Sequence, residues 1–217
     1  MPKQPKRERR EQARRARAEA LKAARRRQQY RRIAYAATAV AAVVVVVVVM
    51  TTLGNSGGKP APEGSVHVSG PARDVPLAKG HPVPSFSAPA LVGGGRVDWS
   101  TYAGKKVVLS IWAPWCPHCQ VELPVLSNVV AGHPDVSLVT IVTAIGQEPG
   151  PSPEQYMKDH NLTFPVAVDN ANGTLVEALG VQAFPTVYFV NSDGTVSSQQ
   201  TGELSEAELQ QLIGALT

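Results

Sequence analysis

The sequence predicts an α/β domain with a mixed β-sheet covered by helices on both faces, preceded by one transmembrane helix. Two observations support this prediction. Residues 33–53 form an uncharged, apolar stretch long enough to span a bilayer. Residues 81–217 then alternate short apolar runs with helix-capping motifs, which is typical of an α/β sheet. This second part is long enough for one domain with its own core.

The charges are strongly segregated along the 217-residue chain, although the formal net charge is only +4. Residues 1–32 hold 14 Lys and Arg against 3 Asp and Glu, a net charge of +11. Residues 81–217 hold 4 against 12, a net charge of −8. A basic nucleic-acid-binding globule is therefore excluded, because the part that is long enough to fold is acidic, and we expect no nucleic-acid partner.

The apolar stretch 33–53 is predicted to be a transmembrane signal-anchor helix. Its 21 residues, at about 1.5 Å each, span roughly 31 Å, which matches a bilayer core of about 30 Å. A cleaved signal peptide is the alternative, but the stretch exceeds the usual apolar length of about 7–15 residues. The positive-inside rule keeps the basic segment 1–32 in the cytoplasm, so the chain is expected to cross the cell membrane once and place 81–217 on the extracytoplasmic side.

The segment between the predicted membrane helix and the domain, residues 54–80, is rich in Gly, Pro and Ser and lacks periodicity. This composition predicts a flexible linker. Its r.m.s. reach of about 30 Å would tether the domain near the outer membrane face.

The elements of the domain follow from local patterns. Two hairpins are predicted, at 86–91 with 96–99 and at 186–190 with 195–199. Short apolar runs predict buried strands at 107–112, 136–143 and 165–168. Helices are predicted over 116–131, 153–160 and 173–179, and from Ser205 to the C-terminal end; Ser152 and Ser205 each begin a capping box.

The two Cys of the chain stand as Cys116-Pro117-His118-Cys119. A structural disulfide that closes so short a loop would contribute only about 2 kcal/mol. A metal site would need further ligands, which no second Cys pair or His cluster supplies. Because the pair opens a predicted helix after a buried strand, the helix N-terminus favours the Cys116 thiolate. We predict a redox-active disulfide with Cys116 as nucleophile and Cys119 as resolving thiol, and neither a cofactor nor a metal.

Two neighbours of the Cys pair are candidates for tuning it. His118 adds a donor, or a positive charge when protonated, that would stabilise reduced Cys116 and make the disulfide a better oxidant. The alternative is an ordinary exposed loop residue. Glu122 lies one helical turn after Cys119 on the same face, where it could exchange a proton with the resolving thiol. The alternative is a solvated carboxylate.

Three segments resemble the thioredoxin superfamily. The octapeptide that begins at Trp112 and ends at Cys119 resembles its active site, and the heptapeptide from Gly180 to Thr186 resembles its cis-proline segment. Glu122, three residues after Cys119, resembles the membrane-anchored TlpA/ResA group, whereas the Pro-His dipeptide matches DsbA-type oxidases. The resemblance implies a thioredoxin-like fold over 81–217 and a set of site residues. These are Cys116, Cys119 and Glu122 for catalysis, Trp115, Pro117 and His118 for tuning, and Trp115, Phe184 and Pro185 for substrate binding.

The function expected from these features is a membrane-anchored extracytoplasmic thiol–disulfide oxidoreductase, working in the oxidising direction. Its expected partners are cysteine-containing exported proteins, a membrane redox partner that resets the disulfide, and the bilayer around 33–53. One alternative is a reductase of the cytochrome c maturation type, which the TlpA/ResA resemblance favours. A second is a non-catalytic thioredoxin-like module that binds copper or a partner protein.

Overall fold

The computed structural model describes residues 64–217 of the chain. The predicted basic segment 1–32, the predicted membrane helix 33–53 and the first ten residues of the predicted linker lie outside the described residues. Within 64–217, no helix combines the length and apolarity that crossing a membrane requires.

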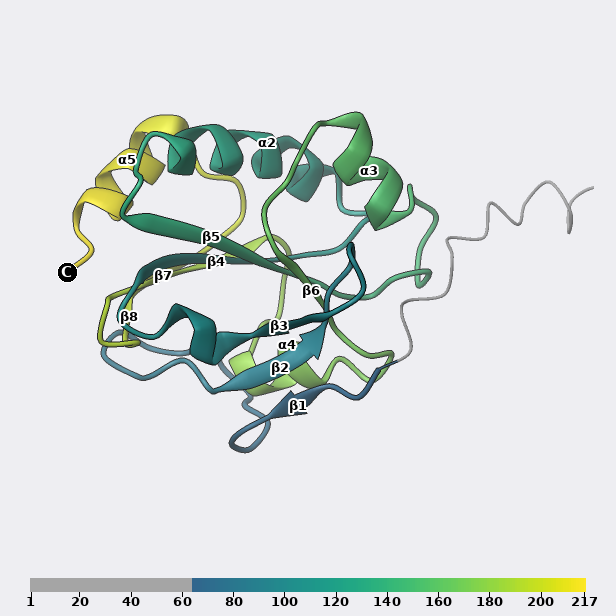
Figure 1. Ribbon diagram of the computed structural model, residues 1–217, viewed down its shortest axis with the longest axis horizontal. Helices are drawn as coiled ribbons and strands as arrows, with labels where there is room; N and C mark the ends of the chain where they lie inside the picture. Colours follow the sequence, from purple (N-terminus) through teal and green to yellow (C-terminus); the bar gives the residue numbers. More distant parts are fainter. Residues whose placement is uncertain (1–63) are drawn as a thin grey trace, which may run out of the picture. The chain divides into compact units, whose positions relative to one another are not determined.

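A five-stranded mixed sheet forms the centre of the domain (Figure 1). Its strands are β4 (Lys106–Trp112), β5 (Val136–Val142), β6 (Val166–Val168), β7 (Thr186–Val190) and β8 (Val196–Thr201). They lie in the order β6-β5-β4-β7-β8. The first three strands in this order are parallel to one another, while β7 pairs antiparallel with both β4 and β8. The predicted mixed sheet is therefore confirmed.

Helices and a second, smaller sheet cover the two faces of the central sheet (Figure 1). One face carries α2 (Pro117–Ala131), α3 (Pro153–Asp159) and α5 (Glu206–Gly214). The other carries α4 (Thr174–Leu179), the 3-10 helix η1 (Trp99–Tyr102) and the antiparallel sheet β1 (His67–Val68), β2 (Phe86–Pro89) and β3 (Arg96–Asp98). Successive side chains of a strand point to opposite faces. Val108 therefore packs with the core under α2 and α5, and Val107 packs with the core under α4 and β2.

Local capping explains where the helices begin and end. The Ser152 hydroxyl accepts a hydrogen bond from the Gln155 amide N–H at 3.1 Å at the start of α3. The Gln155 side chain donates to Asp159 at 2.6 Å instead of returning to Ser152, so only half of the predicted capping box forms. Ser205 and Glu208 form a reciprocal capping box at the start of α5. Helix α4 lies between Gly173 and Gly180, both in the left-handed conformation that glycine adopts most easily. These boundaries agree with the predicted helices.

Residues 64–80 depart from the prediction, because they lie along the domain instead of forming a flexible linker. Strand β1 pairs with β2, and the Arg73 amide donates to the Glu177 carbonyl at 2.8 Å. The Leu77 side chain is only 2% exposed. The linker predicted over 54–80 is therefore wrong for its described part. Its Gly- and Pro-rich composition does not reveal that a few apolar residues are buried by elements far along the chain.

Candidate active site

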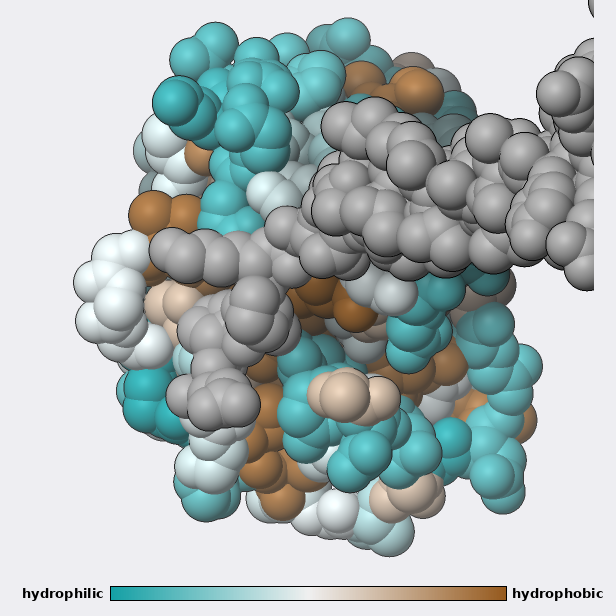
Figure 2. Space-filling model, turned by 90° about the vertical axis from the view of Figure 1, so that its right-hand side faces the viewer, coloured by the Kyte–Doolittle hydropathy of each residue, from teal (hydrophilic) through white to brown (hydrophobic). Residues whose placement is uncertain are grey.

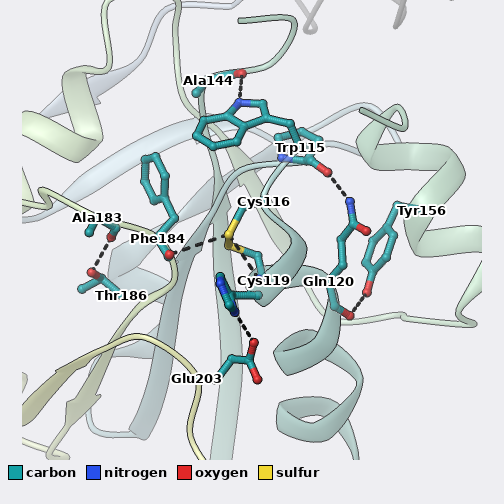
Figure 3. Close-up of a disulfide and its surroundings, with 12 residues drawn as sticks. Trp115, Cys116, Cys119, Gln120, Ala144, Tyr156, Ala183, Phe184, Thr186 and Glu203 are labelled. Atoms are coloured by element: carbon teal, nitrogen blue, oxygen red, sulfur yellow. Dashed lines mark hydrogen bonds and ion pairs between the residues drawn. A yellow bond between two sulfur atoms is a disulfide. The ribbon is translucent and has the colours of Figure 1, made fainter. Parts of the chain in front are cut away.

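The Cys pair lies where the central strand β4 ends and helix α2 begins (Figure 3). Cys116 and Cys119 form a disulfide with a Cα–Cα distance of 5.3 Å. After Trp112 the chain turns, and the Cys116 amide donates to the Ala113 carbonyl at 3.1 Å. Cys116 is the N-cap of α2, and Pro117 occupies the first turn, where its missing N–H is not needed.

The two sulfur atoms have different surroundings. Cys116 is 4% exposed, whereas Cys119 is completely buried. The Cys116 sulfur also accepts a hydrogen bond from the Cys119 amide at 3.2 Å, at the positive end of the α2 dipole. Both the Cys119 amide and the α2 dipole would stabilise a thiolate released at Cys116. The geometry is compatible with Cys116 as the attacking thiolate and Cys119 as the resolving thiol. These two roles stay predictions.

The loop before β7 lies against the disulfide (Figure 3). The Phe184–Pro185 peptide bond is cis, as the resemblance implies. The Phe184 carbonyl oxygen is 3.7 Å from the Cys116 sulfur. The Trp115 ring meets the Phe184 ring edge-on with centroids 6.0 Å apart, and its indole N–H donates to the Ala144 carbonyl at 3.0 Å. The predicted substrate-binding residues Trp115, Phe184 and Pro185 therefore lie together beside Cys116.

Glu122 is a buried carboxyl group on the inner face of α2. Its side chain is 1% exposed, so the alternative of a solvated carboxylate is wrong. One oxygen, Oε1, accepts from the Leu204 amide at 3.1 Å, and no described group hydrogen-bonds the other oxygen. Burial raises the pKa of Glu122 to about 7, with the charge of Glu203 adding to the rise and the Leu204 hydrogen bond opposing it. A carboxyl group with this pKa can give and take a proton near neutral pH.

His118 lies on the exposed side of the pair. Its Nδ1 contacts the Glu203 carboxylate, which comes from the loop between β8 and α5. The side chains of His118 and Glu203 are 70% and 41% exposed, respectively. The alternative of an ordinary exposed loop residue is right about exposure, but His118 lies in the first turn of α2 and has a specific acidic partner. Sequence reasoning missed Glu203 because 85 positions separate the two residues.

Two further polar residues support the start of α2 and were also missed. The Gln120 side-chain amide donates to the Pro114 carbonyl at 2.6 Å. The Tyr156 hydroxyl, from α3, donates to the Gln120 carbonyl at 2.6 Å, and its ring packs against Trp112. No sequence motif signals these contacts, because each depends on how α3 packs on α2.

The surface on the side of the domain that carries α3 is mixed in character. Hydrophobic patches alternate there with hydrophilic residues (Figure 2).

Within the described residues 64–217, no group of three or more His, Cys, Asp or Glu side chains lies close enough together to hold a metal ion.

A Cys-X-X-Cys disulfide at the start of a helix, faced by a cis-proline loop on a mixed sheet, defines a thioredoxin-like thiol–disulfide oxidoreductase. Residues 78–213 match the sequence profile of the Redoxin family, and the chain belongs to that family.

Relatives and solved structures agree with this classification. The thiol-disulfide oxidoreductase ResA of Bacillus cereus is 27% identical over 146 residues, which cover 67% of this chain and 83% of the relative. The soluble secreted antigen MPT53 of Mycobacterium tuberculosis is 33% identical over 134 residues, which cover 61% and 75%. The crystal structure of a secreted M. tuberculosis disulfide oxidoreductase, described as homologous to E. coli DsbE, superposes with a TM-score of 0.53 at 33% identity, over 60% of this chain and 96% of that one.

Proposed function

We propose that this thiol–disulfide oxidoreductase is anchored in the cell membrane by residues 33–53 and works on the extracytoplasmic side, where it transfers its disulfide to reduced exported proteins. The observation that carries the oxidising direction is the position of Cys116. Cys116 is 4% exposed whereas Cys119 is fully buried, and the Cys116 sulfur caps α2 and accepts a hydrogen bond from the Cys119 amide. The helix N-terminus and the amide donor each stabilise a thiolate leaving from Cys116, and a stabilised thiolate makes the disulfide more oxidising.

The exchange would begin when a substrate thiolate attacks the Cys116 sulfur. The Cys116–Cys119 bond breaks, a mixed disulfide forms between substrate and Cys116, and Cys119 leaves with the electron pair. Glu122, partly protonated near neutral pH, lies one helical turn from Cys119 on the same buried face and can supply the proton that this sulfur takes up. A second substrate thiolate then attacks the substrate sulfur and releases Cys116 as a thiolate.

The products are an oxidised substrate and a reduced enzyme, so two electrons have moved to the Cys pair. A membrane redox partner would have to accept these electrons to restore the disulfide. The loop at Phe184 is suited to hold an extended substrate segment beside Cys116, because its carbonyl already lies 3.7 Å from the sulfur.

A reductase of the cytochrome c maturation type is the second candidate, and one observation favours it. The Glu203 carboxylate contacts His118, the residue expected to make the pair oxidising. If this contact removes the whole influence of His118, the pair would give electrons to substrate disulfides instead of taking them.

The reduction potential of the full-length protein in detergent, titrated against glutathione, decides between the two candidates. A value nearer the roughly −120 mV of DsbA supports the oxidising direction. A value nearer the roughly −270 mV of thioredoxin contradicts it and supports the reductase.

Membrane anchoring needs a separate experiment. We expect the full chain to stay with membranes after alkaline washing, and protease added to the outer face to release a fragment that contains residues 81–217. Recovery of the intact protein in the soluble fraction, or protection of the domain from that protease, would refute the proposed anchor or its orientation.

A further inference from the structure

The loop between β8 and α5 touches three parts of the active site through consecutive residues. The Gly202 amide donates to the carbonyl of Pro185, in the cis-proline loop, at 2.9 Å. Glu203 contacts His118, and the Leu204 amide donates to the buried Glu122 carboxylate at 3.1 Å. The two flanking backbone hydrogen bonds therefore fix the point from which the Glu203 side chain reaches the His118 imidazole.

The Glu203 carboxylate lies on the opposite side of the disulfide from the Trp115 ring (Figure 3). The capping box of α5 begins at Ser205, two residues further on, so the chain on this side of Glu203 is also held.

The contact between His118 and Glu203 contributes little to the stability of the fold. Both side chains are substantially exposed, and exposed ion pairs typically contribute between zero and about 1 kcal/mol. Its consequence is at the active site, because it decides where the imidazole next to Cys116 lies and how much of its positive charge is offset.

We propose that Glu203 is a positioning residue for thiol–disulfide exchange, which ties His118 to the β8–α5 loop and offsets its charge. A protonated imidazole two positions after Cys116 favours the reduced thiolate. As long as that imidazole stays protonated, a carboxylate paired with it reduces the net positive charge that acts on Cys116. Glu203 thereby moderates the oxidising strength that the Pro-His dipeptide would otherwise confer. This inference rests on the proposed exchange reaction at Cys116.

The test is the equilibrium of the full-length protein with reduced and oxidised glutathione at low salt. We expect Glu203→Gln, which removes the charge and keeps the shape, to raise the constant for oxidation of glutathione about threefold to fivefold. This is roughly 15–20 mV at about 30 mV per tenfold change. The absorbance of the Cys116 thiolate should also develop at lower pH in this variant.

Two comparisons separate this effect from a structural one. The difference between wild type and Glu203→Gln should shrink in about 1 M salt, where the screening length is about 3 Å. It should vanish in the His118→Gln background, because Glu203 then has no imidazole to act through. Glu206→Gln, an exposed carboxylate in the first turn of α5, is the matched charge control and should leave the equilibrium unchanged.

Three results would overturn the inference. An effect that persists in His118→Gln but disappears in Glu122→Gln would mean that Glu203 acts through the buried carboxyl group. An equal effect of Glu206→Gln would mean that any negative charge near the site changes the equilibrium. No effect of Glu203→Gln would mean that Glu203 does not influence the exchange. Each of these three results can be observed only if the wild-type protein exchanges disulfides with glutathione. A wild-type protein that does not exchange disulfides would instead refute the proposed function.

Discussion

Glu122 and Leu204 are 82 positions apart in the sequence and are joined by a hydrogen bond of 3.1 Å, from the Leu204 amide to Oε1 of the carboxyl group. This bond connects α2, which carries both Cys residues, to the loop that carries Glu203. It satisfies only one of the two carboxyl oxygens, and burial keeps the pKa of Glu122 at about 7. Glu122 is therefore a titrating group inside the domain and beside the resolving Cys.

The first prediction concerns the pH dependence of stability. The pKa of Glu122 is about 7 in the folded protein against 4.5 for an unperturbed Glu, so the folded state binds its proton more tightly. Stability from this group is fully present below about pH 4.5 and is lost as the pH rises through about 7. The total loss is about 3 kcal/mol. Denaturant unfolding at pH 5 and pH 8 should show most of this loss in the wild type and not in Glu122→Gln.

The Gln variant is also the control, because titrating groups that do not interact with Glu122, such as buried Asp169, contribute equally to both proteins. Parallel stability curves for the two proteins would contradict the assignment of this pH dependence to Glu122.

The second prediction concerns the roles of the two Cys residues. Cys119→Ser keeps the sulfur of Cys116, the less deeply buried of the two residues, and should accumulate a mixed disulfide with an oxidised peptide substrate. Cys116→Ser keeps only the fully buried sulfur, so its mixed disulfide should form at least about tenfold more slowly. Mass spectrometry of quenched reactions measures both rates. Equal rates would contradict the assignment of Cys116 as the nucleophile.

The third prediction concerns the aromatic pair beside the disulfide. Trp115→Ala removes a ring that contacts Phe184 and leaves the charge of the site unchanged. We expect kcat/KM for a reduced protein substrate to fall about tenfold, because aromatic contacts of this kind carry much of the binding energy at interfaces. The rate of exchange with glutathione, which is too small to use that surface, serves as the control and should change less than about twofold. Equal losses with both substrates would argue against substrate binding by Trp115.

The fourth prediction concerns the packing of residues 64–80 on the domain. A Cβ at Gly180 would overlap the Val75 carbonyl oxygen, whereas a Cβ at Gly173 would have no neighbour closer than 3.9 Å. Both glycines have nearly the same positive φ, +68° and +71°. Ala at either position therefore has the same conformational cost, and Gly180→Ala should be about 1–3 kcal/mol more destabilising.

Denaturant unfolding measures this difference, and limited proteolysis should show faster cleavage within 64–80 only in Gly180→Ala. If the two Ala variants are equally stable, residues 71–77 do not pack on Gly180 in solution.

Much of the fold could be predicted because its signals are local. The strand at 106–112 follows from a run of apolar residues, and the starts of α3 and α5 follow from capping bonds that span three residues. The same is true of the core of the site. Cys116, Cys119 and Glu122 lie within seven positions of one another on one helix, so their spacing alone places them on one side of α2.

Other features depend on contacts between distant segments. The composition of 64–80 predicts a linker, yet β2, α4 and Tyr188 supply partners for it. Likewise, the sequence predicts that His118 tunes the Cys pair without a partner, whereas in the structure Glu203 from the β8–α5 loop contacts it.

The sequence by itself therefore determined the class of chemistry, because a Cys-X-X-Cys pair at a helix start has its geometry set by a few neighbouring residues. Only the tertiary structure decided how that chemistry is tuned. Glu122 is buried where it accepts a hydrogen bond from Leu204, and His118 pairs with Glu203. In both pairs the two residues are more than 80 positions apart. Electrostatic effects of this kind depend on distance and solvent exposure, which the packing of α2 against the β8–α5 loop sets and which no local pattern encodes.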